Sequence, residues 1–212
     1  MNQKFEENES KNMTHEQWEE EPLEFVEEVD EESEKKRKKK LAREAIIYVI
    51  LLFACVFLIP RYVIQHTIVD GPSMEPTLYN HEHLLVEKIS YHFNDLDRFD
   101  IISFYPFGKE VSTEYYIKRV IGLPGETIQI KGEDIYINGE ILEENYGKDP
   151  ITFAGVASQP IHLQKDEYFV LGDNRSISKD SRSEEVGIVK KEQIGGKAIL
   201  RIWPLNKFGK VK

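Results

Sequence analysis

The chain has 212 residues, a formal net charge of −10, 40% hydrophobic residues and a single cysteine, Cys55. This length allows one large or two small domains, and one cysteine excludes an internal disulfide and a cysteine-based zinc site. The one close histidine pair, His81 and His83, has no third ligand clustered near it, so we expect no metal ion.

Charge is distributed unevenly over the first forty residues. Residues 1–34 are dominated by glutamate, and residues 35–40 read Lys-Lys-Arg-Lys-Lys-Lys. This composition predicts a disordered tail over residues 1–40, acidic and then basic. A short basic run can contact nucleic acid, but positive charge beside an apolar segment is typical of the cytoplasmic side of a membrane span. Its position favours the membrane, so we expect no nucleic-acid partner.

An uncharged apolar run at 45–60 follows the basic block, and apolar residues extend it on both sides. A membrane span needs about 20 such residues. The run therefore predicts one transmembrane helix over 41–63, with the N-terminus in the cytoplasm and residues 64–212 on the far side. A secretory signal peptide is an alternative, but more than forty residues precede the run, and no Ala-x-Ala site follows it directly. A buried helix of a soluble protein explains the basic block less well.

Residues 64–212 contain short apolar runs separated by turn residues. We expect strands at residues 64–69, 84–88, 101–104, 115–121, 127–130, 134–137, 168–170 and 197–202. Asn138-Gly139 between Ile-Tyr-Ile at 135–137 and Glu-Ile-Leu at 140–142 is a hairpin signal. Because no helical pattern of comparable strength occurs there, the fold class predicted is mostly β, an antiparallel sheet domain anchored by one N-terminal helix.

The segment Val-Asp-Gly-Pro-Ser-Met-Glu-Pro-Thr at 69–77 places Ser73 between two prolines after a predicted strand. A stiff turn would hold such a serine exposed and in one place, as a nucleophile requires. Serine is also a common residue of ordinary turns. The segment alone does not separate these two interpretations.

A serine hydroxyl needs a base to take its proton, and the histidines form no Ser/His/Asp pattern here. The alternative base is a buried lysine, since burial lowers the pKa of its ammonium group. Lys118 lies within Tyr-Tyr-Ile-Lys-Arg-Val-Ile-Gly-Leu-Pro-Gly at 115–125. Alternation along a strand places Tyr116 and Val120 on its face and turns Arg119 away. The competing interpretation is a charged lysine on an exposed edge strand, where it prevents pairing with a further strand.

A third segment, Gly-Asp-Asn-Arg-Ser-Ile-Ser-Lys-Asp-Ser-Arg at 172–182, combines small hydroxyl residues with paired aspartates and arginines. Carboxylate–guanidinium bonds can hold such a segment in a tight loop, from which Ser178 could donate to the amine of Lys118. A solvated polar loop fits the same composition.

These motifs occur in the order Ser-Met-x-Pro-Thr at 73–77, Lys-Arg-Val-Ile-Gly-Leu-Pro-Gly at 118–125 and Gly-Asp-Asn-Arg-x-x-Ser-x-Asp-Ser-Arg at 172–182. Together with Asp-Arg-Phe-Asp-Ile-Ile-Ser-Phe at 97–104, they make the chain resemble type I signal peptidase. That family consists of membrane-anchored serine proteases that remove signal peptides from exported proteins. The likeness is to the single-span form of Gram-positive bacteria and covers the span and residues 64–212.

The resemblance implies a Ser/Lys dyad in which Ser73 is the nucleophile and Lys118 the general base. It implies that Ser178 positions the lysine, and that Asp180 and Arg182 form a structural ion pair. The substrates would be exported preproteins cleaved after an Ala-x-Ala-like site, with no cofactor. The lipid bilayer is an implied partner and the secretion translocase a further candidate, at the cell membrane.

Three more positions match the family. Tyr116 matches a residue beside the lysine, and Val69 and Ile117 match residues that wall pockets for small side chains, although alternation faces Ile117 away from Lys118. Two features depart from the family: Gly71 stands where some members carry a serine that helps to bind the oxyanion, and the second domain is reduced to a small hairpin and loop region at 126–160.

Two other functions compete with this one. The self-cleaving SOS repressors also use a Ser/Lys dyad, and Ala154-Gly155 is similar to their cleavage site, but they carry a DNA-binding domain where this chain has an apolar span. A catalytically silent, membrane-anchored binding protein would most simply have lost Ser73 or Lys118, and both are present.

Overall fold

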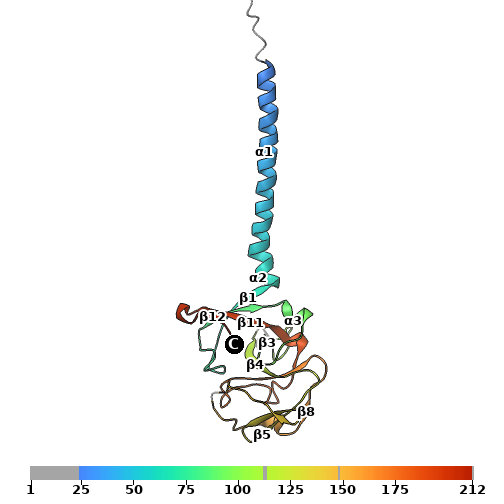
Figure 1. Cartoon of the computed structure of the whole chain (residues 1–212), viewed down its shortest axis with the longest axis vertical. Coiled ribbons are helices and arrows are strands. Elements are labelled where there is room, and N and C mark those ends of the chain that lie inside the picture. Colours follow the sequence, from blue (N-terminus) through green and yellow to red (C-terminus); the bar gives the residue numbers. More distant parts are fainter. Residues whose placement is uncertain (1–23, 112–113, 148, 212) are drawn as a thin grey trace, which may run out of the picture. The chain divides into compact units, whose positions relative to one another are not determined.

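The computed structural model describes residues 24–111, 114–147 and 149–211, and Figure 1 shows the course of the chain. The chain divides into an N-terminal unit, Met1–Leu51, and a second unit, Leu52–Lys212. The first described element is helix α1, Glu24–Phe53. It continues through a five-residue π-helical stretch, η1 at Ala54–Leu58, into the short helix α2 at Ile59–Tyr62.

One helix among the described residues, Glu31–Leu58, is long and apolar enough to cross a membrane. Its apolar side chains are exposed, for example Tyr48 at 69% and Leu52 at 64%. An apolar surface of this kind is stable in contact with lipid, because every backbone polar group of a helix is bonded internally. The helix is thus consistent with the predicted membrane anchor.

The helix begins earlier than the sequence predicted. Residues 24–40 are helical, whereas we expected a disordered tail over 1–40, of which residues 1–23 lie outside the described part. Three glutamate–lysine pairs at i, i+4 spacing, from Glu31, Glu32 and Glu34, link successive turns at 2.8–3.1 Å. Each such pair adds about 0.2–0.5 kcal/mol to helix stability. Composition alone predicted disorder because it ignores this spacing.

The second unit is mostly antiparallel β-sheet, which confirms the predicted fold class. All eight predicted strands are present, within three residues of the expected bounds. The larger sheet has the order β1-β2-β11-β3-β4-β9-β10, with β12 paired to β11. Its strands are β1 Ile64–Ile68, β2 His83–Glu87, β3 Ile101–Phe104, β4 Tyr116–Gly122, β9 Glu167–Leu171, β10 Val189–Lys190, β11 Ile194–Trp203 and β12 Gly209–Lys210.

A smaller sheet in the order β7-β6-β5-β8 occupies the region for which a small hairpin was expected. Its strands are β5 Thr127–Lys131, β6 Asp134–Ile137, β7 Glu140–Ile141 and β8 Ile161–His162. Asn138 and Gly139 connect β6 to β7 with φ angles of 53° and 89°, as a two-residue hairpin turn requires. The predicted hairpin is therefore confirmed.

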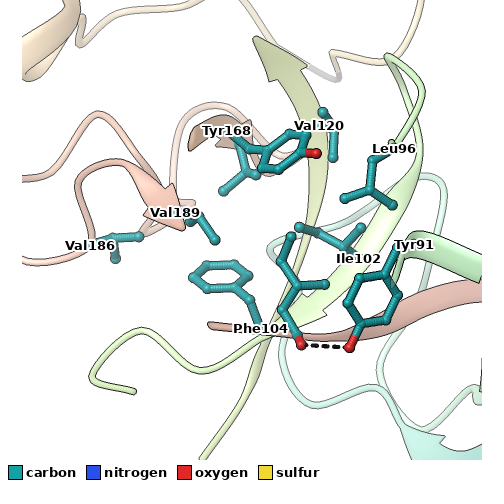
Figure 2. Packing of buried hydrophobic residues seen from close by; sticks show 10 residues of the cluster. Tyr91, Leu96, Ile102, Phe104, Val120, Tyr168, Val186 and Val189 are labelled. Carbon is teal, nitrogen blue, oxygen red and sulfur yellow. Dashed lines mark hydrogen bonds between the residues drawn. The ribbon is translucent and has the colours of Figure 1, made fainter. Parts of the chain in front are cut away.

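Four short helices complete the unit; they are α3 Ser90–Phe93, η2 Gly155–Ser158, η3 Lys191–Gln193 and η4 Leu205–Lys207. Buried apolar side chains form separate clusters on the two faces of β3 and β4. One cluster contains Ile102, Phe104 and Val120, and Figure 2 shows it with Tyr91, whose hydroxyl donates to the carbonyl of Ile194 at 2.9 Å. This cluster lies on the strand face that also carries Lys118.

We predict that Phe104→Ala lowers the free energy of unfolding by about 3–5 kcal/mol, because Phe104 is 0% exposed and the substitution leaves a cavity. The matched control is Phe208→Ala, since Phe208 is 60% exposed and surface substitutions stay within about 0.5 kcal/mol. Denaturant titration of both variants in detergent micelles measures the difference. Equal losses in the two variants would contradict the assigned core.

Candidate active site

Ser73 lies in the turn segment between β1 and β2. The base of this segment is closed by two backbone hydrogen bonds of 2.9 Å, from Val69 N to Glu82 O and from His81 N to Val69 O. Met74 and Leu78 are 1% and 0% exposed and anchor the segment in the apolar interior. These anchors fix the turn and leave the Ser73 side chain partly accessible.

Lys118 lies on β4, which pairs with β3 on one side and β9 on the other. It is therefore an interior strand residue and not the edge lysine considered above. The side chain is only 4% exposed, and its Nζ donates to Ser73 Oγ at 2.8 Å and to the carbonyl of Ile117 at 3.0 Å. The structure thus brings together the two residues expected to form the dyad.

Burial decides the charge of this amine. Desolvation lowers the pKa of Lys118 to about 8, although the carboxylates of Asp180 and Asp173 act in the opposite direction. An ordinary lysine with a pKa of about 10.4 is almost fully protonated at neutral pH. With the lower pKa, a useful fraction of Lys118 is neutral near physiological pH and can accept a proton from the hydroxyl that it contacts.

The neighbours of Lys118 on β4 follow the predicted alternation. The Tyr116 ring lies on the same face, with its centroid 5.4 Å from Lys118 Nζ, and packs edge-on against Phe104. Arg119 points the other way and is fully buried. It makes two bonds to the Asp173 carboxylate, of 2.9 Å from Nε and 2.7 Å from Nη2. Two adjacent cations on one strand therefore have separate surroundings.

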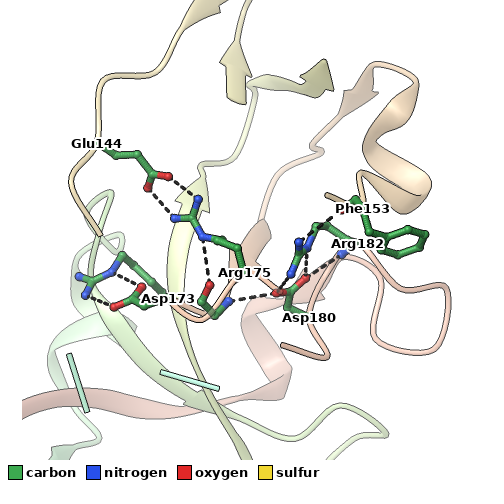
Figure 3. A network of polar contacts seen from close by, with 8 residues as sticks. Glu144, Phe153, Asp173, Arg175, Asp180 and Arg182 are labelled. Carbon is green, nitrogen blue, oxygen red and sulfur yellow. Dashed lines mark hydrogen bonds and ion pairs between the residues drawn. The ribbon is translucent and has the colours of Figure 1, made fainter. Parts of the chain in front are cut away.

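The 172–182 segment is an ion-paired loop and not a solvated one (Figure 3). Arg182 binds the Asp180 carboxylate through Nε and Nη2, both at 2.8 Å, and Asp180 also accepts the Gly172 amide at 3.1 Å. Arg182 reaches the carbonyl of Ser178 at 3.4 Å and that of Phe153 at 3.3 Å. The predicted Asp180–Arg182 pair is thus formed, and it holds the two ends of the loop together.

The same loop holds the Ser73 turn. Asn174 donates through its backbone N to the carbonyl of Ser73 at 3.0 Å and through Nδ2 to the carbonyl of Pro72 at 3.2 Å. Thr77 donates to the Asp173 carboxylate. A Cβ at Gly172 would collide with Ser178 Oγ and with the Ser73 carbonyl oxygen, so only glycine allows this close approach.

Ser178 is placed differently from the sequence expectation. Its Oγ is buried against Gly172 and makes no hydrogen bond within the described part of the chain, so the expected bond to the Lys118 amine is not formed. The positioning role implied by the resemblance therefore stays a prediction.

A cleft of about 520 Å³ opens beside Ser73 and Lys118, and the two expected pocket residues, Val69 and Ile117, both line it. Val69 and Ile117 are 3% and 8% exposed and belong to the same apolar cluster. Alternation had faced Ile117 away from Lys118, but the Lys118 amine folds back onto the Ile117 carbonyl. Val69 and Ile117 give the cleft an apolar wall that suits small apolar side chains, whereas Asp70, Glu114 and Lys179 line other parts of it.

Gly71 has a φ angle of +85°, a conformation that favours glycine. Its amide donates to Asn80 Oδ1 at 3.0 Å. A serine at this position would be strained in this backbone conformation. Among the described residues, no group of three or more histidine, cysteine, aspartate or glutamate side chains is placed to hold a metal ion.

Sequence reasoning missed the role of Asp173 and Glu144. Asp173 is 0% exposed and pairs with Arg119, and Glu144 binds Arg175 of the 172–182 segment from a distant part of the chain. An arginine inside an otherwise apolar strand was a usable signal, because a buried guanidinium requires a carboxylate partner. The sequence did not indicate which carboxylate that would be.

Comparisons with known proteins agree on one family. The family model described as "Signal peptidase, peptidase S26" matches residues 42–203. A signal peptidase I of Leptolyngbya laminosa is 43% identical over 158 residues, which cover 72% of this chain and 75% of the relative. Signal peptidase I P of Bacillus subtilis subsp. natto is 38% identical over 165 residues, 74% of this chain and 86% of the relative. A solved signal peptidase I from Enterococcus faecalis V583 is 35% identical, covering 49% of this chain and 97% of its own, with a TM-score of 0.40.

We predict that Arg182→Met lowers the free energy of unfolding by about 3–5 kcal/mol, because it leaves the buried Asp180 carboxylate without its partner. Lys179→Met is the control, since the Lys179–Glu185 pair is about half exposed and exposed pairs contribute about 0–1 kcal/mol. Chemical denaturation of both variants tests this. A loss below 1 kcal/mol for Arg182→Met would exclude a structural role for the pair.

Proposed function

Because this chain belongs to the signal peptidase family, peptidase S26, we propose that it is a membrane-anchored serine endopeptidase that removes N-terminal signal peptides from exported preproteins. The observation that carries the proposal is the 2.8 Å hydrogen bond between Lys118 Nζ and Ser73 Oγ, made by an amine that is 4% exposed. Cleavage follows an Ala-x-Ala-like sequence whose small side chains enter the cleft beside Val69 and Ile117.

The reaction begins when the neutral amine of Lys118 takes the proton of Ser73 Oγ as this oxygen attacks the scissile carbonyl carbon. The resulting ammonium group gives its proton to the leaving amine, and the mature protein departs. A water molecule then loses a proton to Lys118 and attacks the acyl ester on Ser73. The ester bond breaks, and the ammonium group returns its proton to Ser73 Oγ.

The negative charge on the carbonyl oxygen needs a hydrogen-bond donor in the transition state. The backbone amide of Ser73 serves as that donor in this proposal. Gly71 supplies no hydroxyl, so a second donor must be another backbone N–H or a water molecule. A missing donor costs about 10²–10³ in rate where one is used.

The remaining residues position this pair. The Asp180–Arg182 pair and the Asn174 bonds hold the loop against the Ser73 turn. Ser178 has a buried hydroxyl with no partner among the described side chains, and we assign it to orienting the Lys118 amine once the hydrogen bond to Ser73 is broken.

The apolar helix anchors the enzyme in the lipid bilayer. The basic block at 35–40 keeps the N-terminus in the cytoplasm, and residues 64–212 then lie on the outer side, where signal peptides emerge. The secretion translocase is a candidate partner because it delivers these substrates.

A self-cleaving repressor and a silent binding protein both fit less well, given the family and the intact Ser73–Lys118 contact.

We predict that Ser73→Ala and Lys118→Met each lower cleavage of a preprotein with an Ala-x-Ala site by about 10⁴-fold, because the two groups act as a unit. Lys179→Met is the matched control, since Lys179 lines the same cleft but is exposed. Gel analysis of cleavage by the full chain in micelles provides the measurement. Parent-like rates in either dyad variant would exclude the mechanism.

The pH dependence of kcat/KM gives a second prediction. Only neutral Lys118 is a base, and its pKa is lowered to about 8, so kcat/KM rises about tenfold per pH unit below that pKa and levels off above it. The Lys179→Met variant should keep the same profile. A profile that stays flat from pH about 6 to 9 with chemistry rate-limiting would contradict a lysine base.

A further inference from the structure

A second cleft, of about 570 Å³, lies away from the dyad. Its walls include residues of α2, of the end of β2 with α3, and of the segment after β3. The side chains used in the argument are Arg61, Tyr62, Lys88, Tyr91, Tyr105 and Lys109. All belong to the second unit of the chain.

The charge of this cleft is positive and uncompensated. Arg61, Lys88 and Lys109 line it, and no carboxylate does. Within the described residues, none of the three forms an ion pair with an aspartate or glutamate. Glu87 and Glu110 are the sequence neighbours of Lys88 and Lys109, but neither lines the cleft. Glu87 accepts hydrogen bonds from the backbone of Ile89 and Ser90.

The cations also repel one another. Lys88 Nζ donates to the carbonyl of Arg61 at 3.4 Å, which keeps the lysine beside α2. Burial and the charge of Lys88 both lower the pKa of Lys109. An anion in the cleft would relieve this repulsion. Two lysines with about three N–H donors each and one arginine with about five offer up to about eleven donors for phosphate oxygens.

Another surface cleft does not share this property. The chain has a net charge of −10, and this other cleft is lined by Lys165, Lys190 and Lys191 together with Asp166, Glu167 and Glu192. That cleft neutralises its own lysines. The cleft beside α2 differs from this cleft because no carboxylate balances its cations.

The position of Arg61 in the chain indicates the depth of the cleft relative to a bilayer. Arg61 follows the end of the candidate span, Leu58, by three residues. In a helix this corresponds to about 4.5 Å of rise. The headgroup region on each side of the hydrocarbon core is about 5–8 Å thick, so Arg61 lies at the depth of lipid phosphates. The tyrosine rings suit the same interface.

We propose that this cleft binds an anionic phosphate group, and that its source is the headgroup of an anionic phospholipid. The proposal rests on the membrane anchoring proposed above. Arg61, Lys88 and Lys109 hold the phosphate oxygens, and the tyrosines Tyr62 and Tyr105 line the headgroup. A bound headgroup would fix the catalytic unit at the membrane surface, where its substrates are.

The test uses the full-length chain in dodecyl maltoside micelles. Dioleoyl phosphatidylglycerol, dioleoyl phosphatidylcholine and inorganic phosphate are titrated separately, and native mass spectrometry gives the affinity of each. Lys88→Gln combined with Lys109→Gln is compared with Lys131→Gln combined with Lys165→Gln, two exposed lysines outside the cleft. The basic block at 35–40 is the same in both variants, so its own lipid binding cancels.

The expected result is that the cleft variant binds phosphatidylglycerol about thirty-fold more weakly. Each lysine removed lowers the affinity for an anionic lipid about fivefold, and the two effects multiply. The control variant binds it like the parent, and phosphatidylcholine binds more weakly to all three proteins. On lipid addition, hydrogen exchange slows in peptides covering 88–93 and 105–109 of the parent and of the control variant, but not of the cleft variant.

Equal affinities in the cleft and control variants would overturn the site. Inorganic phosphate that binds the parent cleft as tightly as phosphatidylglycerol would overturn the lipid source and identify a soluble phosphate. Cleavage of an Ala-x-Ala preprotein in the same micelles is measured in parallel and should be unchanged in both variants. If the parent does not cleave, the proposed function fails independently of the phosphate result.

Discussion

The hydrogen bond between Lys118 and Ser73 joins residues 45 positions apart and is made by an amine with almost no access to water. The low pKa of Lys118 depends on this burial, because exposure to water would return the pKa to that of an ordinary, protonated lysine. Burial requires an interior strand, which β4 provides, and a rigid partner, which the anchored Ser73 turn provides. The second unit thus keeps a buried amine with a lowered pKa beside one hydroxyl.

Buried ion pairs supply the rigidity around that contact. Removing charges from water is costly, and a bidentate arginine–carboxylate pair offsets the cost only in good geometry. The Arg119–Asp173 pair lies on the face of β4 opposite Lys118. The Arg182–Asp180 pair lies in the 172–182 segment, which is hydrogen-bonded to the Ser73 turn. Both aspartates also raise the pKa of Lys118, against the larger effect of burial. Pairing each aspartate with an arginine limits this opposing effect, so the ion pairs are compatible with a lowered pKa of Lys118.

The sequence predicted most of this fold and the centre of the site. Alternation placed Lys118 and Tyr116 on one face, and turn chemistry identified the hairpin at Asn138. Contacts between residues far apart in the sequence could not be predicted. Alternation along a strand shows on which face of the sheet a side chain lies, but not which distant residue it contacts. Asp173 was for that reason given no role, and the contact expected from Ser178 is not formed. Three strands of two residues each, β8, β10 and β12, were missed because so short a segment has no measurable period.

A direct titration of the Lys118 side chain tests the central claim. The full chain carrying ¹³C-labelled lysine is followed by NMR in micelles across the pH range, and the Lys118→Arg variant assigns the signal by its absence. The account predicts a midpoint at about 8 for Lys118. A midpoint at about 10.4, the value of an exposed lysine, would contradict it.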